Sequence, residues 1–194
     1  MGLREERPFA FEEFVKWNEV QELDYELVDG RAVMMVGGAP SHSDIASSIV
    51  QHLGPQTRKQ GCKTTSSDLG VRTGVDQMRY PDVLVRCGRE PTGQYHAEKP
   101  KVVVEVLSPS TEWHDNSRKL KEYQAVATID VILIVSPRRI AVDTYRRGAD
   151  GVWTMVQHTN RSDVIDLSGV GASLPLATIY DDIDLDPPEL RVVD

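Results

Sequence analysis

Apolar positions along the N-terminal part of the chain predict a helix followed by a hairpin. Residues 11–20 place Phe11, Phe14, Val15 and Trp17 at helical spacing, which indicates a short amphipathic helix. Residues 25–36 contain Asp29-Gly30 between two apolar runs. Because this dipeptide favours the positive φ angles of tight hairpin turns, we expect two antiparallel strands here.

A second helix is predicted after residues 37–40, whose glycines and proline interrupt regular secondary structure. Ser41 or Ser43 can cap it. Its apolar positions recur every three to four residues, at Ile45, Ile49, Val50 and Leu53. We expect Pro55 to kink or interrupt this helix before Gly61 ends it.

The rest of the chain predicts mainly strands. Extended segments are expected at residues 64–73, 78–86, 102–107, 131–135, 140–145 and 152–157, with a further short strand from Val164. One more helix is expected from Glu112 to Ala127. Helices before and between strands predict an α/β fold with a mixed β-sheet flanked by helices.

Length and composition favour a single domain covering residues 1–194. The chain has 194 residues, of which 40% are hydrophobic, enough for one substantial core. Its net charge of −8 gives no overall positive field that would attract nucleic acid. The segment 181–194 alone holds six acids and one arginine, however. The charge therefore argues against a nucleic-acid substrate without excluding one.

The cysteines and the N-terminus indicate a cytoplasmic protein. Cys62 and Cys87 are 25 residues apart, a spacing that indicates neither a disulfide framework nor a zinc knuckle. The N-terminus lacks the apolar stretch of a signal peptide, and no run of 18 apolar residues is present. We therefore expect a soluble protein without a membrane partner.

Two acids at strand positions are the strongest candidates for chemistry. Glu105 lies in the apolar run 102–107, where an ionised carboxylate is costly unless it is paired or binds a metal. Asp82 follows Pro81 at the start of another predicted strand. Carboxylates that converge from two strands suit a hard divalent cation such as Mg²⁺. The alternatives are a turn residue for Asp82 and a buried salt bridge for Glu105.

The predicted helix after Glu105 adds a possible third element. Asp115, Lys119 and Tyr123 are spaced four apart and share one helical face. An ordinary surface ion pair between Asp115 and Lys119 explains part of this pattern. However, the helix leaves the strand that carries Glu105, so its lysine can approach ligands bound at the carboxyl end of that strand.

These segments together resemble the Uma family, a domain of unknown function that is expanded in cyanobacteria. The matching segments are Tyr25-Glu26-Leu27-Val28-Asp29-Gly30, Tyr80-Pro81-Asp82, Val104-Glu105-Val106-Leu107-Ser108-Pro109-Ser110-Thr111 and Asp115…Lys119…Tyr123. The resemblance covers about residues 10–180 and leaves 181–194 as an acidic tail. The family is assigned to the PD-(D/E)XK restriction-endonuclease-like superfamily, which implies that fold.

The resemblance also implies an active site. Asp82 and Glu105 correspond to metal-binding acids, with the Val106 carbonyl as a further ligand of Mg²⁺ or Mn²⁺. The superfamily lysine would stand where Leu107 does, and Lys119 corresponds to a lysine moved to the following helix. Glu26 resembles an acid contributed by an N-terminal element, with an exposed strand residue as the alternative. Asp115 and Tyr123 are supporting residues, and Tyr123 would support the lysine or contact phosphate.

The implied activity is metal-dependent hydrolysis of phosphodiester bonds in nucleic acid, with DNA favoured over RNA and a homodimer expected. The rival hypothesis is a catalytically inactive binding or interaction module with the same fold. Leu107 and the acidic balance favour the rival. Other features are weaker: the histidines lack metal-site spacing, Gly37-Gly38 lacks a phosphate-loop pattern, and the paired arginines at 138–139 and 146–147 are typical of solvated surfaces.

Overall fold

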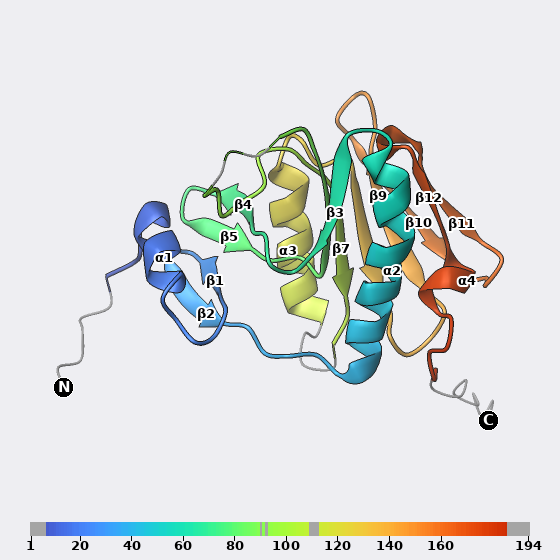
Figure 1. Ribbon diagram of the computed structural model, residues 1–194, viewed down its shortest axis with the longest axis horizontal. Coiled ribbons are helices and arrows are strands. Elements are labelled where there is room, and N and C mark those ends of the chain that lie inside the picture. The colour runs from blue at the N-terminus through green and yellow to red at the C-terminus, as the bar shows by residue number, and fades with distance from the viewer. Residues whose placement is uncertain (1–6, 90, 92, 109–112, 186–194) are drawn as a thin grey trace.

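A six-stranded mixed sheet forms the centre of the molecule in the computed structural model, which describes residues 7–89, 91, 93–108 and 113–185, the side chains of 113–116 excepted (Figure 1). The strand order is β10-β9-β8-β7-β6-β3. The neighbours β7 and β8 are parallel, and the other pairs are antiparallel. The strands are β3 (Cys62–Ser66), β6 (Val83–Cys87), β7 (Pro100–Val106), β8 (Val131–Val135), β9 (Val142–Arg147) and β10 (Trp153–His158).

The two faces of this sheet are covered by different helices, because successive side chains of a strand point to opposite faces. Val104 and Val106 of β7 pack in the core cluster that includes apolar residues of α2 (Pro40–Arg58). The same layer includes β11 (Val164–Leu167), a 3-10 turn (Ser168–Val170), β12 (Ala172–Pro175) and α4 (Leu176–Ile179). Val103 packs instead with Tyr123 of α3 (Trp113–Ala125). Glu105 shares the parity of Val103 and therefore faces α3.

A smaller antiparallel sheet, of order β2-β1-β5-β4, lies at one end of the molecule beside α3 (Figure 1). Its strands are β1 (Tyr25–Val28), β2 (Arg31–Met34), β4 (Val71–Gly74) and β5 (Gln77–Arg79), and α1 (Phe11–Asn18) packs on it. The hairpin turn has positive φ at both Asp29 (49°) and Gly30 (73°). The prediction of a hairpin at this dipeptide is confirmed.

Two extended segments predicted from the sequence are each divided between the two sheets. The segment 64–73 contributes to β3 of the large sheet and β4 of the small one, and 78–86 contributes to β5 and β6. Sequence periodicity is local and cannot show that a chain changes sheets. The crossing between β5 and β6 falls at Pro81 and Asp82, so Asp82 stands at the junction of the sheets.

The second helix differs from its prediction at its N-terminus and at Pro55. Helix α2 begins at Pro40 with Ala39 as its N-cap and no side-chain cap, so the capping roles of Ser41 and Ser43 are wrong. Proline suits this first position because its missing N–H would have no partner there. The helix also continues through Pro55 to Arg58, and the predicted interruption does not occur.

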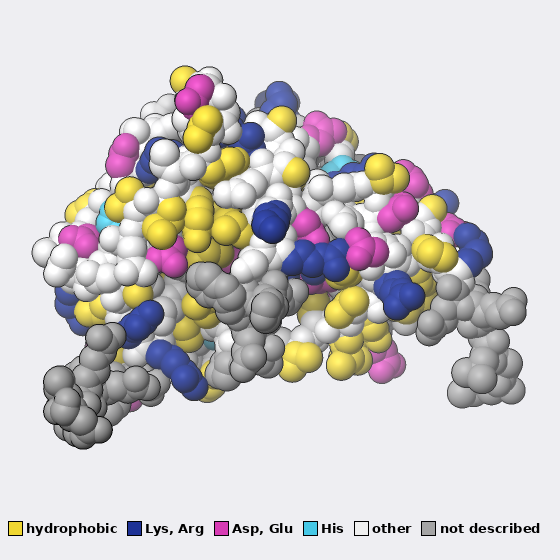
Figure 2. All heavy atoms as spheres, turned by 180° about the vertical axis from the view of Figure 1, so that it is seen from behind, with side chains coloured by type: hydrophobic (Ala, Val, Ile, Leu, Met, Phe, Trp, Pro, Cys, Tyr) yellow, Lys and Arg dark blue, Asp and Glu magenta, His cyan; other side chains and the backbone are white. Residues whose placement is uncertain are grey.

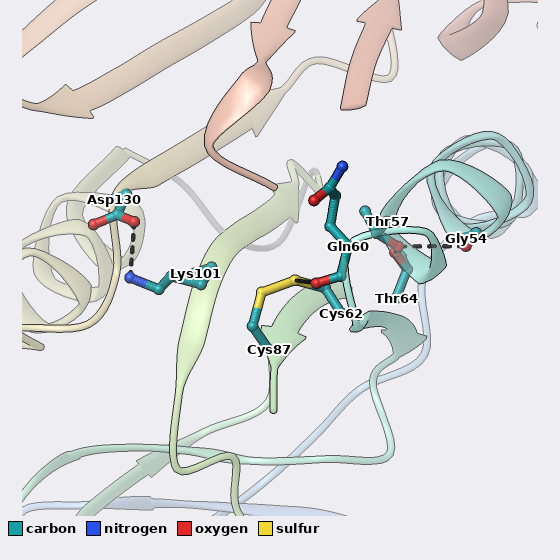
Figure 3. Close-up of a disulfide and its surroundings, with 8 residues drawn as sticks. All are labelled: Gly54, Thr57, Gln60, Cys62, Thr64, Cys87, Lys101 and Asp130. Atoms are coloured by element: carbon teal, nitrogen blue, oxygen red, sulfur yellow. Dashed lines mark hydrogen bonds and ion pairs between the residues drawn. A yellow bond between two sulfur atoms is a disulfide. The ribbon is translucent and has the colours of Figure 1, made fainter. Parts of the chain in front are cut away.

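A disulfide joins Cys62 and Cys87, contrary to the sequence expectation (Figure 3). The antiparallel register of β3 and β6 places these two residues directly opposite each other. Their Cα atoms are 4.0 Å apart. The expectation was wrong because a separation of 25 residues carries no information about strand pairing. Within the described part of the chain, no helix is both long and apolar enough to cross a membrane.

Candidate functional site

Asp82 lies at the edge of the large sheet where β7 ends. Because Val83 pairs with Val104 in the antiparallel β6–β7 ladder, the residue before Val83 faces the end of β7. The Val106 backbone N–H donates a hydrogen bond of 2.6 Å to Asp82 Oδ2. This contact fixes the carboxylate beside the residues expected to share its site. The interpretation of Asp82 as a simple turn residue therefore does not account for its position.

Glu105 approaches the same edge from the α3 face. Its carboxyl accepts a 2.6 Å hydrogen bond from the Tyr123 hydroxyl at Oε1, and Lys119 Nζ lies 3.7 Å from Oε2. Burial raises the pKa of Glu105 to about 7, although the Lys119 charge acts in the opposite direction and Asp82 adds to the rise. The positive charge of Lys119 therefore does not fully offset the cost of burying the ionised carboxylate. A further positive charge at this edge would stabilise it.

Lys119 lies beside two of the candidate acids, Glu26 and Glu105. Its ammonium lies 3.0 Å from Glu26 Oε1 as well as 3.7 Å from Glu105, and its side chain is 12% exposed. Burial lowers the pKa of Lys119, but the charges of Glu105 and Glu26 outweigh burial and the pKa is raised. Lys119 is therefore a fixed cation. A helical lysine can stand beside Glu105 even though Leu107 occupies the superfamily position.

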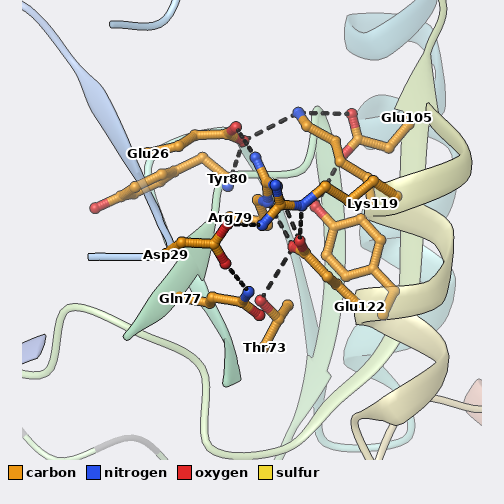
Figure 4. Close-up of polar contacts among 11 residues, drawn as sticks. Glu26, Asp29, Thr73, Gln77, Arg79, Tyr80, Glu105, Lys119 and Glu122 are labelled. Atoms are coloured by element: carbon orange, nitrogen blue, oxygen red, sulfur yellow. Dashed lines mark hydrogen bonds and ion pairs between the residues drawn. The ribbon is translucent and has the colours of Figure 1, made fainter. Parts of the chain in front are cut away.

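Glu26 belongs to a buried charge network, which rules out its interpretation as an exposed strand residue. Arg79 is 2% exposed and donates to Glu26 at 2.7 Å and to Glu122 at 2.6 and 3.0 Å. Arg118 joins Glu122 to Asp29 of the hairpin turn. Figure 4 shows Arg79 and Lys119 pointing into the space between the three glutamates. This network connects α3 to the small sheet and holds Lys119 in place.

The structure describes the side chain of one of the two supporting residues. Tyr123 is fully buried and donates a hydrogen bond to Glu105, which also lies beside Lys119, and its role in supporting the lysine or contacting phosphate stays a prediction. Its hydroxyl meets Glu105 because α3 packs on the sheet. The spacing of residues along one helix gives no information about such a contact. The side chain of Asp115 lies outside the described residues, and its role stays a prediction.

His42 is a member of this site that the sequence interpretation missed. Its Nε2 lies 3.2 Å from Asp82 Oδ2. The hydrogen bond to Asp82 raises the pKa of His42 despite partial burial. A signal was present, since His42 precedes Ile45 and Ile49 at helical spacing and is therefore a polar residue on the apolar face of α2.

An open cavity of about 500 Å³ adjoins His42 and Asp82. Its wall includes small or hydroxyl side chains from three segments, among them Gly37, Gly38, Ser43, Ser47 and Ser66. Because both His42 and Asp82 line it, a molecule in this cavity would contact the candidate site directly. The cavity offers room for part of a substrate beside the acids.

The donors at this edge are of the kind that divalent cations prefer. Two carboxylates and one backbone carbonyl are hard oxygen ligands. Among the described residues, no three histidine, cysteine or acidic side chains are already gathered as a ligand set, because Glu105 turns toward Tyr123 and Lys119. The donor chemistry and the undercompensated charge of Glu105 fit a cation, which would bring further water or substrate oxygens.

Two arginines that could have contacted nucleic-acid phosphates instead form contacts within the protein. Arg147 donates to the carbonyls of Ile129, Gln124 and Val126 and stacks on Trp153. Arg146 donates to the Asp166 carbonyl. On the face seen in Figure 2, basic and acidic side chains are interspersed and form no continuous basic stripe. Any phosphate contacts on this face would therefore be few.

The buried carboxyl of Glu105 makes a prediction about stability and pH. The folded state keeps a proton on Glu105 up to about pH 7, whereas the unfolded state releases it near 4.5. The stability contributed by this group is therefore present below pH 4.5 and is lost as the pH rises to about 7. In metal-free protein at pH 8, we expect Glu105→Gln to raise the free energy of unfolding by about 2 kcal/mol, or roughly 4–8 °C.

Thermal unfolding in EDTA at pH 5 and pH 8 measures this effect. The gain from Glu105→Gln should shrink at pH 5, because the wild-type carboxyl is protonated in the folded state there and the pH is close to its unfolded-state pKa of 4.5. A variant that is equally or less stable than the wild type at pH 8 would show that Lys119 fully compensates the ionised carboxylate.

The fold and this edge define the class of protein: a mixed α/β domain with acids and a lysine at the end of a central strand. A crystal structure from Anabaena variabilis, described as a "putative nuclease belonging to DUF820", matches with a TM-score of 0.71 at 18% identity, covering 89% of this chain and 98% of that chain. A likeness at this identity concerns the fold. The expected fold class is confirmed.

The chain belongs to the Uma2 family, whose description is "Putative restriction endonuclease" and whose model matches residues 11–177. A protein of Synechocystis sp. described as uncharacterized is 32% identical over 172 residues, which cover 87% of this chain and 90% of that protein. The resemblance inferred from the sequence is confirmed. The match establishes membership of this family, while catalysis is a separate question.

Proposed function

We propose that the protein is a metal-dependent endonuclease that hydrolyses phosphodiester bonds of nucleic acid, with DNA favoured over RNA. One observation carries the proposal: at the end of β7, Val106 holds the Asp82 carboxylate, the neighbouring Glu105 pairs with Lys119, and Asp82 lines an open cavity. Membership of a family whose description is "Putative restriction endonuclease" supports the reaction class.

The chain's own groups divide the work of the proposed reaction. Asp82, Glu105 and the Val106 carbonyl would hold Mg²⁺ or Mn²⁺, with Asp82 fixed by the Val106 N–H. When bound, such a cation polarises the phosphodiester and lowers the pKa of a coordinated water. Tyr123 orients Glu105 by its hydrogen bond, which keeps that carboxylate at the edge of the sheet.

Lys119 supplies fixed positive charge. Because Glu26 and Glu105 keep it protonated, it cannot serve as a general base at neutral pH. It can instead donate hydrogen bonds to the attacking water or stabilise the charge that develops on the phosphate oxygens. Preorganised charge of this kind needs no rearrangement when the substrate reacts. The Arg79 network, which fixes Glu26, keeps the ammonium in position.

A nicking assay on supercoiled plasmid DNA tests the proposal. We expect wild-type protein to nick DNA in Mg²⁺ or Mn²⁺ but not in EDTA, and Asp82→Ala to be at least 100-fold slower, since a metal ligand is removed. Asp181→Ala is the matched control, because its surface ion pair with Arg161 lies outside the site. Equal rates for wild type and Asp82→Ala, or cleavage of neither DNA nor RNA, would remove the proposal.

A non-catalytic binding module is the second candidate. It is favoured because three arginines contact other groups of the protein, namely Arg118, Arg146 and Arg147. Calorimetric titration with Mn²⁺ and a gel-shift at low salt discriminate between the two, because phosphate contacts are strongest at low salt. Metal binding with neither DNA association nor cleavage would support the module.

We also propose a homodimer, because cutting both strands of a duplex requires two sites. Light scattering measures the assembly, and the ratio of linear to nicked plasmid measures its consequence. A monomer that produces nicked circles only would contradict this part of the proposal.

A further inference from the structure

His42 lies against two of the three groups proposed to hold the cation. Its imidazole is 3.2 Å from Asp82 Oδ2, and the Val106 backbone is close enough to contribute to the raised pKa of the ring. It comes from α2, on the opposite face of the sheet from Glu105 and Lys119. The edge is therefore approached from both faces, with a nitrogen donor on one side and a lysine on the other.

The separation of His42 and Asp82 suits two ligands of one ion. Metal–nitrogen and metal–oxygen bonds are about 2.1 Å long, so two neighbouring ligands of a cation lie roughly 3 Å apart. The observed 3.2 Å between Nε2 and Oδ2 is close to this value. Both side chains are also partly accessible, at 17% and 18%, and both line the cavity. An ion could thus enter without unfolding any element.

Gly38 provides the space that the imidazole occupies. A Cβ atom at this position would lie 2.7 Å from His42 Cγ and 2.8 Å from Nδ1, which is too close for real contacts. Gly38, two residues before helix α2, therefore has a steric reason to be glycine. Gly37-Gly38 lacks a phosphate-loop pattern, and the structure gives Gly38 a different role: it holds the ring against Asp82.

We propose that His42 is a nitrogen ligand of the cation at this edge, and that the centre therefore selects Mn²⁺ or a similar first-row transition ion over Mg²⁺. Imidazole is a good ligand for transition ions, whereas Mg²⁺ strongly prefers oxygen. The inference rests on the proposed function for the location of the cation at Asp82 and Val106. It does not depend on cleavage of nucleic acid.

The simpler alternative is that His42 is a structural partner that only fixes the Asp82 carboxylate. The two alternatives differ in what a bound ion would experience. A structural partner leaves the ligand set all-oxygen, so its loss would weaken Mg²⁺ and Mn²⁺ alike. A ligand contributes a nitrogen, so its loss would weaken Mn²⁺ selectively.

Calorimetric titration of the full chain with Mn²⁺ and with Mg²⁺ separates these alternatives. We expect wild-type protein to bind Mn²⁺ at least tenfold more tightly than Mg²⁺. His42→Ala should lose at least tenfold in Mn²⁺ affinity and less than threefold in Mg²⁺ affinity. His52→Ala is the matched control on the same helix, since His52 contacts the Ser173 carbonyl and not the site. It should change neither affinity.

Pulsed electron paramagnetic resonance of bound Mn²⁺ supplies a direct readout. A coordinated imidazole nitrogen modulates the electron spin echo, and we expect this modulation in wild type and in His52→Ala but not in His42→Ala. Gly38→Ala should weaken it, because the added methyl group displaces the ring while keeping the ligand. Absence of nitrogen modulation in Mn²⁺-loaded wild type, equal losses for both metals in His42→Ala, or a chain that binds neither metal would overturn the inference.

The same measurements keep this inference separate from the proposed function. Nitrogen coordination in a protein that cleaves neither DNA nor RNA would support the ligand role and contradict the nuclease. Metal-dependent cleavage without nitrogen modulation in the Mn²⁺ spectrum would support the nuclease and contradict the ligand role of His42.

Discussion

Replacing Lys119 with methionine should reduce metal-dependent cleavage by about 100- to 1000-fold, the size of effect seen when one preorganised donor to a developing charge is lost. Methionine keeps much of the aliphatic stem and removes only the ammonium, which lies 3.0 Å from Glu26 and 3.7 Å from Glu105. The substitution should not weaken cation binding, because a nearby positive charge repels a cation. Mn²⁺ affinity should therefore be kept or increased.

The comparison that decides this prediction is between cleavage rate and Mn²⁺ affinity in the same variant. Lys121→Met is the matched control, because Lys121 lies two residues along α3 and is exposed. It should retain both properties. If Lys119→Met cleaves at the wild-type rate, the lysine is a structural ion pair and the proposed mechanism loses its cationic group. If it loses Mn²⁺ binding, the defect lies in the fold of the site.

Replacing Arg79 with methionine should be the most destabilising single substitution in the site. Arg79 is 2% exposed, and its loss leaves Glu26 and Glu122 without their main counter-charge in a buried environment. Removing one partner from a buried ion pair typically costs about 3–5 kcal/mol. Urea denaturation in EDTA, followed by circular dichroism, measures the free energy of unfolding.

Arg118→Met provides the internal comparison, because Arg118 contacts the same Glu122 from a position that is 42% exposed. An exposed pair is worth less than about 1 kcal/mol, so this variant should remain close to wild type. Adding Glu122→Gln to Arg79→Met should recover part of the loss, since one buried charge is removed. Equal costs for Arg79→Met and Arg118→Met would mean that burial does not set the strength of this network.

Local sequence determined most of the secondary structure. The strand at 131–135 and the helix at 11–18 follow from apolar periodicity over a few residues, and Asp29-Gly30 specified its turn because few dipeptides accept two positive φ angles. The sequence also identified Asp82, Glu105 and Lys119 as candidates, by an acid in an apolar strand and by resemblance to a family. Their catalytic roles stay predictions.

Only the tertiary structure decided what surrounds these candidates. Glu26 and Tyr80 are 54 positions apart and Arg79 and Glu122 are 43 positions apart, yet each pair is joined by a contact that no local pattern encodes. The disulfide and the division of two extended segments between sheets depend on strand pairing in the same way.

The contact of His42 with Asp82 shows the division most clearly. The sequence determined that a histidine lies on the apolar face of a helix, because helical spacing is a property of neighbouring residues. That this face meets the end of β7, and that Gly38 leaves room for the ring, follows from the packing of α2 on the sheet. Packing joins residues that are distant in sequence, so the sequence alone determined the candidates and the fold determined their partners.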